Sequence, residues 1–429
     1  MRNNKQVFFP LKIFHLYLLS TLFLYLFGPV GFEKNNVIPL VISIIFYQMF
    51  FSFGYVFQMK FIGQYKRVRT KNGEITPEYR KEYAFVIFTL FYVLMNLFVY
   101  TSVDLFSIFD IWKRILASLA SPLETYQNSL YSTITSPFIL LLVVISPIYY
   151  FGIIWLLVRF GRLRSLNKIA VCLVLFLDCS RWILQGKNKG IFDVLFLLVS
   201  VFMVVNAQNN IKINGSKSAY KGVIYTLVSI IIISVCLAYF NNAIISRKEF
   251  FSNYYSFKDN IIVTMFPDFM TPLLVNITDY LTQGYHSFSY IFEVDWVPMY
   301  GLGSGRVLID NFSILVGRDL FLDTYQYRLA DFGIDPFVNW HSAYAWIAND
   351  VHWIGVIFVM FIFGMLYADS WVSSIYDNKI SSHVMFYFLS LTIIYIPANT
   401  QVLMQTSTFF SFSIFIIARL FKNVRINIK

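Results

Sequence analysis

Long apolar runs recur from one end of the chain to the other and are separated by short polar segments. A helix that crosses a bilayer needs about 20 mostly apolar residues, and ten of the runs approach this length. They lie near residues 11–32, 37–59, 84–103, 138–158, 169–184, 190–205, 223–240, 353–372, 384–398 and 402–418. The pattern predicts an all-α, polytopic integral membrane protein of about ten transmembrane helices, with both termini on one side. The first run has no cleavage site after it, so it is expected to stay in the membrane as a signal anchor.

The longest interval between predicted spans is residues 241–352, which the pattern assigns to the outer side as one large loop. Its apolar stretches, such as Ile261 to Leu281, are broken by Pro267, Asp268 and Pro272, so short amphipathic helices lying against the membrane surface are expected. The sequence thus predicts an N-terminal transmembrane bundle of about seven spans at 1–240, the external loop at 241–352, and about three spans with a cytoplasmic tail at 353–429.

Composition agrees with a membrane protein and excludes an ordinary soluble enzyme, since only 13% of the 429 residues are charged, against about 25% in soluble domains. The net charge of +11 is typical either of nucleic-acid binding or of the positive-inside rule. Most Lys and Arg residues fall in the tails and in alternate loops, which lie on one side of the predicted spans; among them are Lys66, Arg67, Arg162 and Arg164. This distribution predicts cytoplasmic termini and argues against a nucleic-acid partner.

The external segment 241–352 differs from the rest because it holds 12 acidic and six basic residues, a net charge of −6. Long loops rich in Asp, Gly, Trp and Tyr more often carry function than act as linkers. We therefore look for the functional residues mainly in this segment.

A cationic element, SRWILQGKNKG at 180–190, stands between the fifth and sixth predicted spans on the outer side, which should be poor in Lys and Arg. Arg181, Lys187 and Lys189 are suited to phosphate oxygens, so we expect them to bind a pyrophosphate lipid head group. The alternative is that these side chains snorkel to the phosphates of ordinary lipids.

Aromatic and amide side chains dominate a second cluster, YLTQGYH at 280–286 followed by Trp296 and the run YGLGSGR at 300–306. Aromatic rings stack on sugars while amides bind hydroxyl groups, so the cluster suits a glycan groove; an interfacial aromatic belt is the alternative. The candidate glycan-binding residues are Tyr280, Gln283, Tyr285, Trp296, Tyr300 and Trp340. The GLGSG run lacks the preceding strand and the following Lys-Ser/Thr of a phosphate-binding loop.

A third cluster, WHSAYAWIANDVHWIG at 340–355, ends the external segment. A neutral His341 can take a proton from a sugar hydroxyl, and a carboxylate such as Asp350 can orient it or act in its place. The alternative is that these residues only make hydrogen bonds at the interface. A zinc site of His286, His341 and His352 lacks the spacing of a ligand motif, so no metal is expected.

These segments, in this order, resemble the Wzy-type oligosaccharide repeat-unit polymerases of bacterial O-antigen and capsule assembly. The resemblance rests on YLTQGYH, YGLGSGRVL at 300–308, the YR pair at 327–328 and the WHSAYAWIANDVHWIG stretch, with SRWILQGKNKG similar to the family's arginine-bearing region. One departure concerns the family pattern Asp-x-Gly-x-x-Gly, where this chain has Asp350, His352 and Gly355, so one glycine is replaced. Ser342 stands where relatives often have Thr.

The resemblance implies a membrane glycosyltransferase that moves a growing glycan from undecaprenyl pyrophosphate to a new lipid-linked repeat unit, on the outer face of the bacterial cytoplasmic membrane. Arg181, Lys187 and Lys189 would hold the pyrophosphate with help from Arg306, and Arg328 would assist the reaction beside His341 and Asp350. Undecaprenyl pyrophosphate-linked oligosaccharides, membrane lipids and a chain-length regulator would be the partners, and no cofactor is expected.

Three other classes of protein stay open at this stage. A ligase of the O-antigen type would use the same donor with a different acceptor, and the sequence separates it poorly from a polymerase. A flippase or transporter for the lipid-linked unit usually shows internal repeats with broken helices, which this sequence lacks. A purely structural partner in an assembly complex would leave the charged outer residues unexplained.

Overall fold

The computed structural model describes residues 4–62, 79–104, 107–131, 137–212, 237–245 and 260–421. Every regular element in these ranges is a helix, and six helices are long and apolar enough to cross a membrane. These six segments are Phe9–Phe27, Val37–Phe61, Tyr79–Thr101, Phe138–Val158, Lys189–Ile211 and Ala343–Tyr376. The predicted all-α membrane architecture is therefore confirmed at this coarse level, while the number of ten spans and the external position of the long loop stay predictions.

The six segments coincide with six of the ten predicted spans. A seventh, 169–184, lies in helix α8 (Ser165–Ile183), which also carries Lys168, Asp178 and Arg181 and is not among the six. The last two predicted spans lie in the shorter apolar helices α16 (Ile380–Tyr395) and α17 (Thr406–Leu420). Of the remaining span, 223–240, residues 223–236 lie outside the described residues and 237–240 are helical.

Packing divides the chain into two compact units that do not follow the three consecutive parts expected from the sequence. The first unit comprises Met1–Val68, Tyr254–Asn378 and Phe388–Ile416, and the second comprises Arg69–Asn253, Lys379–Tyr387 and Ile417–Lys429. The first unit thus joins the first two predicted spans to most of the predicted external loop. We describe each unit by itself.

In the first unit, α3 (Val37–Phe57) packs along α15 (Ala343–Tyr376), and α2 (Phe9–Phe27) packs against α12 (Thr271–Tyr290). Glycines allow the first pair to approach closely: a Cβ atom on Gly54 would lie 1.9 Å from the Phe361 carbonyl oxygen, and one on Gly364 would lie 2.0 Å from the Phe51 oxygen. Close contact through small residues is a common way for transmembrane helices to associate.

The segment from 260 to 352 folds into several helices, most of them short; α12, with 20 residues, is longer than the interrupted apolar pattern predicts. They are α11 (Ile261–Thr264), η4 (Asp268–Met270), α12, η5 (Ile291–Glu293), α13 (Arg306–Val316), η6 (Leu320–Asp323), α14 (Tyr325–Arg328) and η7 (Leu329–Phe332). The chain leaves α11 before Pro267 and starts α12 at Thr271–Pro272, where a proline is tolerated.

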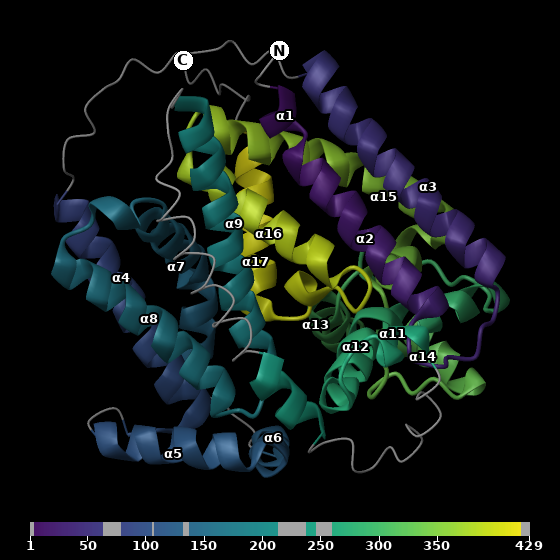
Figure 1. Ribbon diagram of the computed structural model, residues 1–429, viewed down its shortest axis with the longest axis horizontal. Coiled ribbons are helices and arrows are strands. Elements are labelled where there is room, and N and C mark those ends of the chain that lie inside the picture. Colours follow the sequence, from purple (N-terminus) through teal and green to yellow (C-terminus); the bar gives the residue numbers. More distant parts are fainter. Residues whose placement is uncertain are drawn as a thin grey trace. The chain divides into compact units, whose positions relative to one another are not determined.

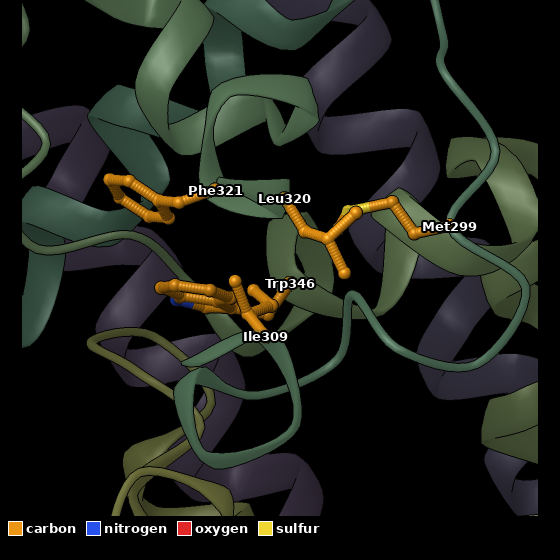
Figure 2. Packing of buried hydrophobic residues seen from close by; sticks show 5 residues of the cluster. All are labelled: Met299, Ile309, Leu320, Phe321 and Trp346. Atoms are coloured by element: carbon orange, nitrogen blue, oxygen red, sulfur yellow. The ribbon is translucent and has the colours of Figure 1, made fainter. Parts of the chain in front are cut away.

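A small apolar core holds this segment on the first turns of α15. Met299, Ile309, Leu320, Phe321 and Trp346 form the buried cluster shown in Figure 2, with Leu302 and Met404 packed against it. The cluster joins the 299–303 loop, α13 and η6 to one face of α15.

Helix α15 starts ten residues before the span predicted at 353–372, and it kinks where that span was expected to begin. His352, inside the helix, has φ 61° and ψ 157°, a conformation that favours glycine and strains other residues. The nine residues from Ala343 to Val351 belong with the loop segments, and the rest of α15 forms the apolar span.

The second unit contains α4 (Tyr79–Thr101), α7 (Phe138–Val158), α8 and α9 (Lys189–Lys212), with α5 (Ile108–Ala120) and α6 (Pro122–Tyr131) at one end of α4 and α8 (Figure 1). At the other end, the Glu82 carboxylate accepts hydrogen bonds from the Asn167 amide at 2.5 Å and from the backbone N–H of Arg164 at 3.1 Å. The basic segment 159–168 therefore lies at the opposite end of this unit from α5 and α6.

Candidate functional site

Asn349 connects three loops at the first turns of α15. Its side-chain nitrogen donates to the Gly303 carbonyl oxygen and to Oε1 of Gln326, both at 2.9 Å. Its Oδ1 accepts the backbone N–H of Tyr325 at 2.9 Å, and its backbone oxygen accepts the indole N–H of Trp296 at 3.0 Å. Asn349 is 1% exposed, so these bonds satisfy polar groups that burial would otherwise leave unpaired. We did not expect this role from the sequence; the only signal is an amide directly before Asp350 on a helix face that is otherwise apolar.

The carboxylate of Asp350 organises the GLGSG loop. Its Oδ1 accepts the backbone N–H groups of Gly301 and Gly303, each at 2.8 Å, and its Oδ2 accepts the hydroxyl of Ser304. The N–H groups of the loop therefore bind the carboxylate of Asp350, as the N–H groups of a backbone nest bind an anion. Asp350, predicted as a catalytic group, has both oxygens engaged in holding a loop in place.

The segment before α15 is held against α12. The Gln283 side-chain oxygen accepts the backbone N–H of Trp340 at 2.9 Å, and the Ser287 hydroxyl donates to the Trp340 carbonyl oxygen at 2.7 Å. A Cβ atom on Gly284 would lie 2.2 Å from the Pro397 carbonyl oxygen, so the chain after α16 also packs here. The motif residues at 280–286 and 340–342, more than 50 positions apart, therefore lie side by side.

His341 lies at this junction and is 3% exposed. Neither ring nitrogen has a hydrogen-bond partner in the part of the chain that the structure describes. Burial lowers the pKa of the imidazole to about 3, although the charge of Asp335 acts in the opposite direction. The ring is therefore neutral at pH 7, as a general base requires, but a pKa this low makes it a weak proton acceptor until a charge near it changes.

The two predicted arginines of the first unit already have partners within it. Arg306 pairs with Asp310 at 2.7 Å, and its guanidinium carbon lies 3.9 Å from the centre of the Phe321 ring. Arg328, which is half-buried, donates to the backbone oxygen of Asp295. Both guanidinium groups retain further N–H donors, because each has five.

Of the six predicted glycan-binding residues, Tyr280, Gln283 and Trp340 lie together, with the Tyr280 and Trp340 ring centres 5.2 Å apart. Tyr300 is 86% exposed on the GLGSG loop. Trp296, like Tyr300, belongs to the loop region held by Asn349 and Asp350. Tyr285 differs, since it is fully buried and its hydroxyl lies 3.1 Å from that of Thr21 on α2. Its ring packs α12 against α2 and does not line a groove.

The three cations predicted to bind pyrophosphate lie in the second unit, around the turn between α8 and α9. Arg181 pairs with Asp178 at 3.3 Å and Lys189 with Asp193 at 2.8 Å. Trp182 lies between them, with Arg181 and Lys189 placed 4.3 and 5.2 Å from its ring centre. The Lys187 ammonium donates to Oε1 of Gln185 at 3.3 Å. A glycine at 190 leaves room for the indole of Trp182, because a Cβ atom there would overlap it.

Within the residues that the structure describes, no group of three or more His, Cys, Asp or Glu side chains is placed to hold a metal ion. Comparison with protein-family models, curated proteins and solved structures finds no match to this chain. The function is therefore inferred from the sequence motifs and from the geometry of each unit.

Proposed function

We propose that this chain polymerises lipid-linked oligosaccharide repeat units of a bacterial surface polysaccharide. It would transfer the growing glycan from undecaprenyl pyrophosphate to a new lipid-linked unit on the outer face of the cytoplasmic membrane. The observation that carries this proposal is the mutual hydrogen bonding of the segments on which the Wzy-type resemblance rests. Residues 280–286 bind 340–342, and the 300–306 segment binds Asn349 and Asp350.

The backbone supplies a second support. The family pattern Asp-x-Gly-x-x-Gly has its first glycine at the position of His352, and this residue adopts the positive φ that glycine favours. A backbone suited to glycine at this position supports the resemblance although the glycine itself is replaced.

In the proposed reaction, a hydroxyl oxygen of the acceptor sugar attacks the anomeric carbon of the donor glycan. The bond from that carbon to the pyrophosphate oxygen breaks, and its electron pair leaves with the pyrophosphate. The hydroxyl proton passes to His341 or to an external carboxylate. Arg328 would stabilise negative charge near the acceptor, and Arg181, Lys187 and Lys189 would stabilise the leaving pyrophosphate. A chain-length regulator would act as a partner of the polymerase.

The test is deletion of the gene in its host, followed by separation of the lipid-linked and surface glycans by size. Glycans reduced to single repeat units, and restored by the wild-type gene, are the expected result. Long chains left on the carrier lipid would replace the proposal by a ligase, and repeat units trapped inside the cell would replace it by a flippase. An unchanged glycan profile would reject all three.

Complementation with variants tests the individual cations. Arg181→Ala and Arg328→Ala should fail to restore long chains when their amounts in the membrane equal that of the wild type. Arg318→Ala is the matched control, because Arg318 is 63% exposed and pairs only with Asp323 among the ion pairs of the described residues. Exposed pairs of this kind contribute about 0–1 kcal/mol to stability. Normal polymerisation by the Arg181 and Arg328 variants would remove these residues from the reaction.

A further inference from the structure

A polar pocket in the second unit involves none of the residues to which we have assigned a function. Its volume is about 510 Å³, and it is lined by residues from the end of α4, from α5 and α6, and from the turn after α8. Hydroxyl and amide side chains dominate the lining, among them Tyr100, Thr101, Ser118, Thr125, Asn128 and Gln185.

The chemistry of this lining suits a polyhydroxylated, uncharged ligand. Hydroxyl and amide groups both donate and accept hydrogen bonds, as sugar hydroxyls do, and the Tyr100 ring offers an apolar face. The charged groups of the lining are one arginine and one carboxylate, Arg114 and Glu124, and Arg114 pairs with Asp110 at 3.0 Å. The pocket therefore has no excess of positive charge to select a free anion.

Gln185 supplies a donor without a partner in the wall of the pocket. The residue is 7% exposed, and its Oε1 accepts a hydrogen bond from Lys187. Its Nε2 has no hydrogen-bond partner among the described residues. A buried donor without a partner is unfavourable, and a rotation of the Gln185 amide that turned Nε2 to a ligand hydroxyl would relieve this.

The pocket adjoins the cations of the α8–α9 turn. Tyr100, which lines it, has its ring centre 5.5 Å from the guanidinium carbon of Arg181, and Gln185 is bonded to Lys187. Gly186 joins the turn to α6, since a Cβ atom there would lie 2.5 Å from the backbone nitrogen of Tyr126. A diphosphate bound by Arg181 and Lys187 would thus carry its attached sugar next to the pocket.

Helix α5, beside the pocket, carries an exposed apolar face that suits a lipid surface. Phe109, Trp112, Leu116 and Leu119 recur every three or four residues on one side of the helix, and they are 80%, 51%, 50% and 40% exposed. The pocket residues of α5 lie on a different side of the helix. An amphipathic helix with a Trp- and Leu-bearing outer face is typical of the membrane interface.

From these observations we propose that the pocket binds the first sugar of a lipid-linked diphosphate glycan. Its diphosphate would lie at Arg181 and Lys187, and its lipid would run past α5 into the bilayer. The identity of the glycan as a polymerase substrate rests on the proposed function, whereas the selection of a sugar by the pocket does not.

Photo-cross-linking with the full chain in detergent tests the proposal. A photoreactive amino acid is placed at Asn128, which lines the pocket, or at its exposed neighbour Gln127, which does not. Each protein is purified from unlabelled cells, mixed with lipid-linked oligosaccharides extracted from host cells grown on tritium-labelled glucose, and irradiated. Label should attach to the protein with the probe at 128 and be lost with the probe at 127. Equal labelling at both positions, or none at 128, would overturn the proposal.

A matched pair of substitutions on α5 tests whether the labelled sugar occupies the pocket. Ala117→Phe fills the pocket from an exposed position, and Ala120→Phe adds the same group on the same helix outside it. The first change should abolish labelling at 128 and the second should leave it intact. Labelling that survives Ala117→Phe would place the sugar elsewhere.

Gene deletion in the same strain separates this proposal from the proposed function. If labelling follows the expected pattern while deletion leaves glycan length unchanged, the sugar pocket is supported and the polymerase proposal fails. If deletion shortens the glycan but both probe positions label equally, the polymerase proposal is supported and the pocket is rejected.

Discussion

Replacement of Asp350 by Asn tests whether this carboxylate holds the GLGSG loop. Hydrogen bonds to a charged group contribute about 1.5–3 kcal/mol each, against about 1 kcal/mol for neutral pairs. Asn keeps an acceptor for the Gly301 and Gly303 amides and a partner for Ser304, but it loses the charge. Asp350 is half-buried, so solvent weakens all three bonds, and we expect the loop to lose about 2 kcal/mol.

Amide hydrogen exchange of the full chain in detergent measures this loss directly. A decrease of about 2 kcal/mol in the free energy of local opening should speed exchange at Gly301 and Gly303 by about 30-fold. Asp319→Asn is the control, because Asp319 makes a similar bond to the backbone N–H of Phe321 in another turn. Unchanged exchange at both glycines in Asp350→Asn would refute the reasoning. If such a variant also failed to polymerise, Asp350 would be assigned to the chemistry instead.

Three further predictions concern stability. Acidification from pH 7 to 5 should lower the free energy of unfolding by about 2 kcal/mol through His341. The folded-state pKa of this group is lowered to about 3, so over this range the unfolded state binds a proton that the folded state does not. His341→Gln should remove this part of the pH dependence of thermal unfolding. His352→Gly should be more stable than His352→Ala by about 1 kcal/mol or more, since only glycine accepts this backbone without strain, and an equal melting temperature would contradict the kink. Gly54→Ala should lower the free energy of unfolding by about 2 kcal/mol through its clash with Phe361, whereas Gly161→Ala, which has open space, should not.

The sequence predicted the motifs of the candidate site but not the contacts between them. The motifs at 280–286, 300–306 and 340–355 were found as separate clusters, and the fold brings them together through bonds that none of them specifies alone. Tyr285 was expected in a groove because tyrosines bind sugars, but it fills the contact between α12 and α2. Nothing in the sequence distinguishes Asn349 from an asparagine on the surface, yet its side chain and backbone bind three loops.

The sequence by itself determined six helical segments that are long and apolar enough to cross a membrane, the break at Pro267, and the boundary near 352/353 between polar loop and apolar span. These are local properties, set by the apolar length of a segment and by the backbone limits of proline. Only the tertiary structure decided that Asp350 binds the GLGSG loop, that His341 is shut away from water, and that the α5–α6 pocket adjoins Arg181. Each of these depends on which side chains meet across long distances in the chain, and hydropathy carries no information about such pairs.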